Sequence, residues 1–429
     1  MDIFLLGIDG LPRWMWQQFA DSGVMPNSAK LLKTGTLVPM KSALPEVSSA
    51  AWASIVTGEN SGGHNVFGFT DLMDGSYTLG FTSSRTFRSK PFWARDGAGP
   101  SLIMNVPQTY PAQPMPGMLV SGFVALDLKR AVHPPKELAW LESIGYAVDA
   151  DMSLVAKGKQ RFVDELHRVM AVRCQALHHH WDREPWQNIM FVFTGTDRIN
   201  HYLWEDYEDS SSPFHQTFLD YYHEVDTQIG HILERLDDDV TIAAVSDHGF
   251  ARQHMSVNVN CLLAESGFLK LKESQRPSYI DMLPETKAFA MDPGRIYLHR
   301  QGRYPRGTVA ADDADLLMLE LTTFFENATV NGLPIASEVI LGKDAYSGPF
   351  AHRAPDLIVM AAKDIALSGR MNLSELIEST PINGKHTYEE SSFFVRGERL
   401  GKIPSDMKVE NVLDVVMPKQ VHQIASRAA

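Results

Sequence analysis

The sequence predicts an α/β protein whose core is a doubly wound, mostly parallel sheet with helices on both faces. Short apolar runs rich in β-branched residues recur along the chain, and segments with helical periodicity separate several of them. Runs that are apolar throughout, rather than alternating, are typical of strands buried on both faces. The expected strands are residues 3–9, 101–107, 188–197, 241–247 and 354–361.

Two long segments between these strands have apolar residues at helical spacing. Residues 158–181 precede the strand at 188–197, and residues 213–236 precede the strand at 241–247. Both are predicted to be amphipathic helices. Helices that alternate with fully apolar strands cover both faces of a parallel sheet, which is the reason for expecting a doubly wound core.

The chain of 429 residues is longer than a usual single domain. Residues 255–352 fit the core pattern poorly, because their apolar runs, such as TKAFAM and RIYLHR, are short. We expect this stretch to form an inserted cap over the sheet that selects the substrate. Residues 1–254 and 353–429 would then form the core.

The composition excludes several classes of protein. Hydrophobic residues make up 44% and charged residues 21%, and no apolar run is long enough to cross a bilayer. The start of the chain lacks the basic segment of a signal peptide, and only Cys174 and Cys261 are present, so we expect a cytoplasmic protein. A net charge of −13 argues against a nucleic acid polymer or an anionic membrane as partner. An anionic substrate would need a local positive charge, for which a bound metal is the simplest source.

Three of the expected strands end in aspartate, at Asp9, Asp197 and Asp247. In open α/β sheets the ligand crevice lies beyond the carboxyl ends of the strands. A single aspartate in such a turn is more often structural, because its side chain caps the next helix. Three at one edge of a sheet favour a functional site.

Histidines accompany these aspartates. His201 follows Asp197 by four residues, a spacing that puts both side chains on one face of a helix, and such a pair can hold a divalent cation. His248 directly follows Asp247 where a strand ends, so both side chains can reach the crevice. His386 lies in a glycine-containing loop and is unremarkable by itself.

A hydroxyl group precedes another predicted helix. Ser49 begins the predicted helix SAAWASIVTG, and Ser48 immediately precedes it. A serine at this position often only caps the helix. A hydroxyl at a helix N-terminus also faces the positive end of the helix dipole, as a bound phosphate would. A metal could lower the hydroxyl pKa and make it a nucleophile.

In their order along the chain, these motifs resemble the alkaline phosphatase superfamily, and most closely its type I phosphodiesterase and nucleotide pyrophosphatase branch. The resemblance covers most of the chain. The motifs that carry it are GIDG, VSSAAWASIVTG, NVPQTYP, VSGF, GTDRINH, SDHGF, APDLIV and GKH.

The resemblance implies an alkaline phosphatase-like fold with two divalent metal ions, usually zinc, with manganese as the alternative. Asp197, His201 and His386 would hold one ion, and Asp9, Asp247, His248 and the Ser48 oxygen would hold the other. Ser48 would be the catalytic nucleophile and form a phosphoserine intermediate, with Ser49 as the neighbouring candidate.

The implied activity is hydrolysis of a small phosphoester, with phosphodiester or nucleotide pyrophosphate substrates favoured. A phosphomonoesterase or a cofactor-independent phosphomutase is the alternative, and an inert metal- or phosphate-binding module is a weaker one. A sulfatase is disfavoured, because no Cys or Ser begins the expected C/S-x-P-x-R signature.

Two departures from the family pattern bear on the substrate. Relatives commonly place a phosphate-contacting asparagine several residues after the histidine represented here by His64, and this position is Phe69, with Asn65 the nearest asparagine. No arginine is assigned to a phosphate clamp, although Arg198 is adjacent to Asp197.

Overall fold

The computed structural model describes residues 1–418, and its centre is an eight-stranded sheet within this range. Five neighbouring strands of the sheet are parallel, and the strands outside them pair antiparallel. The α/β fold class and the mostly parallel sheet are therefore confirmed. The strands in spatial order are β2 (Thr36–Met40), β21 (Ser391–Arg396), β9 (Thr241–Val245), β1 (Ile3–Ile8), β8 (Asn188–Phe193), β5 (Ser101–Met104), β6 (Gly117–Val120) and β7 (Val132–His133).

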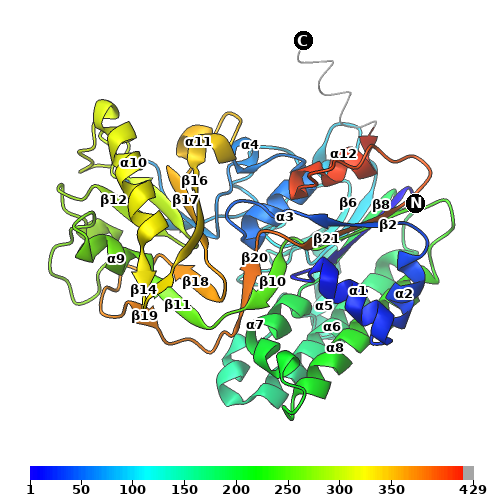
Figure 1. Cartoon of the computed structure of the whole chain (residues 1–429). Helices are drawn as coiled ribbons and strands as arrows, with labels where there is room; N and C mark the ends of the chain where they lie inside the picture. The colour runs from blue at the N-terminus through cyan, green and yellow to red at the C-terminus, as the bar shows by residue number, and fades with distance from the viewer. Residues whose placement is uncertain (419–429) are drawn as a thin grey trace.

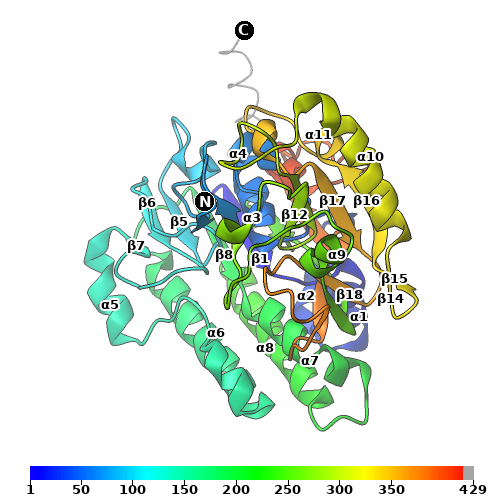
Figure 2. The ribbon, with the colours of Figure 1, turned by 90° about the vertical axis from the view of Figure 1, so that its left-hand side faces the viewer.

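Helices cover both faces of this sheet (Figures 1 and 2). Side chains alternate along β1, so that Phe4, Leu6 and Ile8 join the core on one face, whereas Ile3 and Leu5 join the core on the other. The first face is covered by α1 (Arg13–Ser22), α2 (Pro26–Leu32), α5 (Leu138–Ser143), α6 (Lys159–Trp181), α7 (Gly195–Glu208) and α8 (His215–Leu233), and the second by α3 (Ser48–Thr57) and α12 (Val412–Val416).

A second lobe, formed mainly by residues 255–383, has its own hydrophobic core and smaller sheets (Figure 1). Helix α10 packs against β16 and β17 there. Its elements are β11 (Met255–Asn258), α9 (Val259–Glu265), β12 (Ala288–Met291), β13 (Arg295–Leu298), α10 (Ala311–Asn327), β14 (Thr329–Val330), β15 (Leu333–Pro334), β16 (Ala336–Leu341), α11 (Gly342–Ala345), β17 (Leu357–Ala361), β18 (Ile365–Ser368) and β19 (Ile377–Glu378).

The strand expected at residues 354–361 is present as β17, but its expected place in the central sheet is wrong. It pairs antiparallel with β13 and β16 in the second lobe. A strand that is apolar on both faces is compatible with either sheet, so its composition could not decide between them. The division of the chain into a core and an inserted cap stays a proposal, and the pairing favours a cap that extends from residue 255 to about residue 383.

The two lobes are joined by a short antiparallel ladder. The chain leaves the core along β10 (Gly249–Arg252) and returns along β20 (Gly384–Thr387), which pairs with it. The hairpin of β3 (Thr70–Leu72) and β4 (Leu79–Phe81), preceded by the short helix α4 (Ser61–His64), comes from the core sequence but contributes Leu72 and Tyr77 to the core of the second lobe.

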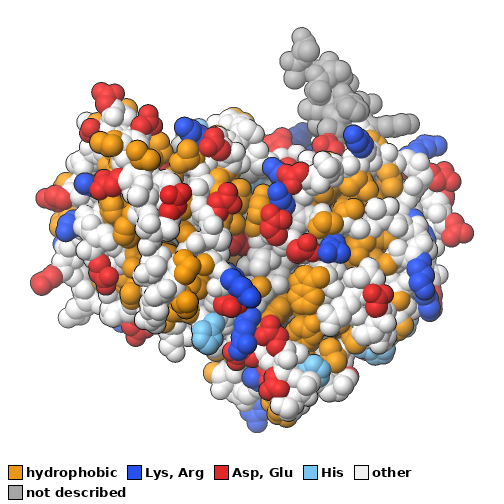
Figure 3. All heavy atoms as spheres, in the orientation of Figure 1, with side chains coloured by type: hydrophobic (Ala, Val, Ile, Leu, Met, Phe, Trp, Pro, Cys, Tyr) orange, Lys and Arg blue, Asp and Glu red, His pale blue; other side chains and the backbone are white. Residues whose placement is uncertain are grey.

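The visible surface carries charges of both signs. On the face seen in Figure 1, acidic side chains are spread among basic ones (Figure 3). Within residues 1–418, no helix combines the length and the hydrophobicity that a membrane crossing requires.

Candidate active site

Three neighbouring parallel strands bring the aspartates together. Asp9 follows β1, Asp247 follows β9, and Asp197 lies in the first turn of α7, directly after β8. The turns are tied to one another: the Thr196 hydroxyl donates to the Asp9 carbonyl at 2.6 Å, and the Gly10 amide donates to Asp247 Oδ1 at 3.3 Å. The edge of the sheet predicted from the sequence is therefore where the structure places these carboxylates.

Two histidines meet at Asp197. His201 lies one helical turn further along α7, and its Nε2 is 3.3 Å from Asp197 Oδ1. His386 arrives on β20, with its Nε2 3.1 Å from the same oxygen and 3.0 Å from His201 Nε2. A residue that looks unremarkable in the sequence thus belongs to the cluster.

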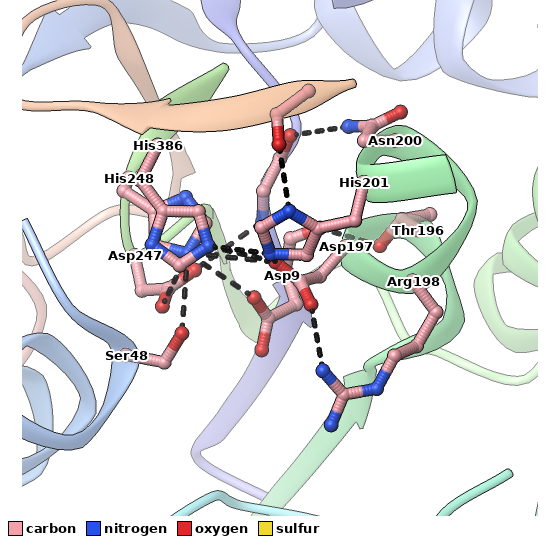
Figure 4. Close-up of polar contacts among 12 residues, drawn as sticks. Asp9, Ser48, Thr196, Asp197, Arg198, Asn200, His201, Asp247, His248 and His386 are labelled. Carbon is pink, nitrogen blue, oxygen red and sulfur yellow. Dashed lines mark hydrogen bonds and ion pairs between the residues drawn. The ribbon is translucent and has the colours of Figure 1, made fainter. Parts of the chain in front are cut away.

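His248 and Ser48 complete the cluster (Figure 4). His248 Nε2 is 3.3 Å from Asp247 Oδ2, 3.6 Å from Asp9 Oδ1 and 3.8 Å from Asp197 Oδ1. Ser48, the first residue of α3, places its Oγ 3.1 Å from the same nitrogen. The Ser49 hydroxyl is buried and has no hydrogen-bond partner among residues 1–418, so it makes no equivalent contact.

The three imidazoles are oriented by backbone carbonyls. The Nδ1 atoms of His201, His248 and His386 lie 2.8 to 3.0 Å from the carbonyl oxygens of Gly384, Gly249 and Glu46. Because a carbonyl only accepts, each Nδ1 carries a proton, and the Nε2 atom of each ring faces the cluster. Donation of the Nδ1 proton to a backbone carbonyl is typical of histidines that bind a metal through Nε2.

The donor atoms fit divalent cations. Asp9 Oδ1 and Asp247 Oδ2 are buried without hydrogen-bond partners among residues 1–418, although each faces His248 Nε2. Lone pairs turned toward one another repel unless a proton or a cation lies between them. Two groups have donor atoms close enough to share an ion: Asp197, His201 and His386 form one, and Asp9, Asp197 and His248 form the other.

The pKa values of the carboxyl groups reflect this crowding. Burial, followed by the charges of Asp247 and Asp197, raises the pKa of Asp9 well above its ordinary value. Burial also raises the pKa of Asp247, to about 6. Burial would raise the pKa of Asp197 as well, but His201 and His386 lower it well below its ordinary value. A bound cation would favour the ionised form of all three.

Two further residues hold the carboxylates in place. Trp52, one turn after Ser48 on α3, donates from Nε1 to Asp9 Oδ2 at 3.0 Å. The guanidinium of Arg198 donates to Asp197 Oδ2 at 3.1 Å and pairs with Asp149 at 2.6 Å. Arg198 therefore fixes a carboxylate of the cluster. The four-residue spacing of Ser48 and Trp52 was the one signal in the sequence that could have pointed to Trp52.

The positions at which the sequence departs from the family pattern lie outside this cluster. The Asn65 side chain donates to the Thr86 carbonyl at 3.4 Å. Phe69 lies on the wall of a cavity that is also lined by His201 and His386. His64 has a structural environment: its Nε2 lies 3.0 Å from Ser54 Oγ, and its Nδ1 accepts from the Val66 amide at 3.2 Å.

Burial lowers the pKa of His64 to about 3, so this ring is neutral in the folded protein. An unfolded histidine takes up a proton near its ordinary pKa, so the stability that His64 confers is complete above about pH 6.5 and decreases toward pH 3, by about 1.4 kcal/mol per unit of pKa difference. We expect denaturant unfolding to show a larger stability loss between about pH 7.5 and about pH 5 for the wild type than for His64→Gln. Equal losses would show that His64 does not titrate on unfolding in this range.

The doubly wound sheet together with the second lobe forms an alkaline phosphatase-like fold. More narrowly, the chain belongs to the type I phosphodiesterase/nucleotide pyrophosphatase family, whose sequence profile matches residues 3–389. The resemblance drawn from the motifs is thereby confirmed. Members of this family are phosphoester hydrolases and typically contain two metal ions.

Solved structures show the same fold at low sequence identity. Phosphonoacetate hydrolase from Sinorhizobium meliloti superimposes with a TM-score of 0.62 at 14% identity, covering 96% of this chain and 94% of its own. Murine ectonucleotide pyrophosphatase/phosphodiesterase 5 gives a TM-score of 0.54 at 10% identity, covering 99% and 95%, and the human protein gives 0.54 at 12% with the same coverage. Comparison with curated protein sequences gave no significant match.

Proposed function

We propose that the protein hydrolyses small phosphodiesters with two divalent metal ions and a transient phosphoserine at Ser48. The observation that carries the proposal is the position of the Ser48 Oγ, 3.1 Å from His248 Nε2, at the edge of a cluster of buried carboxylates with unpartnered oxygens. Family membership supports phosphoester hydrolysis as the reaction. A diester is favoured over a monoester because the matching family is a phosphodiesterase family.

Each ion would have its own set of ligands. Asp197, His201 and His386 would hold one, and Asp9, Asp247, His248 and Ser48 would hold the other. Asp197 lies close enough to both sets to contribute its charge to each. Imidazole and carboxylate ligands without thiolate suit Zn²⁺, with Mn²⁺ as the alternative. Bound there, the ions would supply Lewis acidity, which lowers the pKa of the Ser48 hydroxyl and neutralises charge on the phosphate.

The residues of the chain would position the reaction. Ser48 Oγ forms a bond to phosphorus, the bond from phosphorus to the leaving oxygen breaks, and the proton lost from Ser48 is matched by one gained by the leaving group. Water then attacks phosphorus, the bond from phosphorus to Ser48 Oγ breaks, and Oγ regains a proton as the phosphate leaves with its remaining organic group. The N-terminus of α3, where Ser48 lies, favours the negative charge of the phosphate. Trp52 and Arg198 keep the carboxylates oriented throughout.

We also propose that the protein acts in a reducing compartment such as the cytoplasm. Cys174 and Cys261 are both free and buried. Burial raises the pKa of the Cys261 thiol to about 11 and also raises the pKa of Cys174, so both thiols stay protonated and unreactive.

Removal of metal tests the proposed function. We expect the purified protein to contain about two divalent ions per chain, and a chelator to lower hydrolysis of bis(p-nitrophenyl) phosphate by about a hundredfold or more. Zn²⁺ or Mn²⁺ should restore the rate, and p-nitrophenyl phosphate should be the poorer substrate. Chelator-resistant hydrolysis would contradict the metal-dependent mechanism, whereas full metal occupancy without turnover would indicate an inert binding module. Transfer of a phosphoryl group within a sugar phosphate, without phosphate release, would indicate a mutase.

A further inference from the structure

A cavity of about 400 Å³ opens beside the cluster, between the core and the second lobe. His201 and His386 form one part of its wall, so a phosphoester bound at the cluster would have one of its organic groups beside or inside this space. Its size is in the range of cavities that hold small organic ligands.

Most of the wall is apolar and comes from distant parts of the chain. Strands β17 and β18 of the second lobe supply much of it, and the core contributes residues near Ser48 and the β3–β4 hairpin. The apolar lining residues are Val47, Phe69, Pro293, Val359, Ala361, Ile365, Ala366, Leu367 and Ile382.

The charged groups of the wall are mostly engaged by the protein. Lys385 donates from Nζ to the carbonyl oxygens of Ala362 at 2.8 Å and Ile365 at 2.6 Å. Asp292 accepts from the Gly369 amide at 2.6 Å. Glu46 also lines the cavity, so the wall carries a second acidic side chain.

The wall therefore offers little to a second anion. None of its residues, all within the described part of the chain, is an arginine, and its one lysine is matched by two acidic side chains. A phosphate or carboxylate that entered this space would be desolvated without gaining a free cationic partner. The desolvation free energy of the anion would therefore oppose binding. An apolar group would be stabilised by the same transfer.

We propose that this cavity binds an uncharged, largely apolar organic group of the phosphoester. The substrates would then be esters of apolar alcohols or phenols, rather than nucleotides, polyphosphates or esters that carry a second acid. The Gln253 amide on the wall can hydrogen-bond to one hydroxyl or carbonyl of such a group. The inference rests on the proposed function, because it assumes that phosphate binds at the cluster.

Alkylphosphonates and phenylphosphonate test the cavity without turnover, because each has a single organic group on phosphorus, joined by a P–C bond in place of the ester. Calorimetry on the metal-loaded protein should show that affinity rises about threefold to fivefold for each methylene from methylphosphonate to butylphosphonate. Phenylphosphonate should bind at least about tenfold more tightly than carboxymethylphosphonate. Equal affinity along the alkyl series, or tighter binding of carboxymethylphosphonate or AMP, would overturn the inference.

A variant that fills the cavity adds a second test. Ala366→Phe should abolish the dependence on alkyl length and leave methylphosphonate affinity within about twofold. Ala311→Phe is the matched control, because Ala311 is exposed at the start of α10, and it should bind the series like the wild type. Retention of the full alkyl dependence by Ala366→Phe would contradict the assignment of this cavity.

The failure of this inference differs from a failure of the proposed function. If phosphate does not bind at the cluster, methylphosphonate will not bind either, and the protein will not hydrolyse diesters. If only the cavity is misassigned, methylphosphonate will bind and hydrolysis will proceed, but affinity will not follow the apolar size of the group.

Discussion

Ser48→Ala should lower the rate of phosphoester hydrolysis by about a thousandfold or more and leave the fold and the bound metal largely intact. The substitution removes the hydroxyl that lies 3.1 Å from His248 Nε2. Alanine is well tolerated in the first turn of a helix, so the unfolding free energy should change by about 1 kcal/mol or less. Steady-state kinetics, thermal unfolding and metal analysis measure the three quantities separately.

The neighbouring serine supplies the control for this prediction. Ser49→Ala removes an equally buried hydroxyl that has no hydrogen-bond partner among residues 1–418, so activity should stay within about threefold of the wild type. Mass spectrometry of protein quenched during turnover should find the phosphoryl group on Ser48. Labelling of Ser49, or normal turnover by Ser48→Ala, would show that the nucleophile has been misassigned.

The second large effect is expected for Asp197→Asn. Asp197 Oδ1 lies within 3.8 Å of the Nε2 atoms of His201, His248 and His386, so its charge serves both proposed metal sites. The amide keeps the size but removes the charge. We expect at least one of the two ions to be lost and activity to fall by about a thousandfold or more. Mass spectrometry measures the metal content, and a diester hydrolysis assay measures the loss of activity.

Asp149→Asn is the matched control for Asp197→Asn. Asp149 is also a carboxylate partner of Arg198, at 2.6 Å, but it lies outside both groups that could hold a metal. The variant should keep both ions and lose less than about tenfold in activity, because Arg198 still contacts Asp197. Two tightly bound ions in Asp197→Asn would contradict the role proposed for this residue.

The sequence was sufficient to predict that several aspartate and histidine side chains lie together at one edge of the central sheet. Strand ends at Asp9 and Asp247, and the helical spacing of Asp197 and His201, are local patterns with one structural outcome each. Parallel neighbouring strands must then bring these ends to one edge of the sheet. The fold class followed from the same runs, because strands buried on both faces need helices on both sides.

Other features of the site could be identified only from the folded structure. His386 has no local signal, and it reaches Asp197 only because β20 returns along β10 after the second lobe. Tertiary packing likewise decided that β17 joins the second lobe, because an apolar strand is compatible with either sheet. The cavity wall combines residues as distant as Val47 and Ile382, so no sequence window contains it.

Local patterns thus determined where the side chains of Asp9, Asp197, His201 and Asp247 point, because backbone periodicity fixes the direction of neighbouring side chains. Contacts between distant segments decided how those residues are oriented and what space surrounds them. The carbonyls of Gly384 and Glu46 that orient His201 and His386, and the apolar wall beside them, are products of packing between distant segments and cannot be read from the order of residues alone.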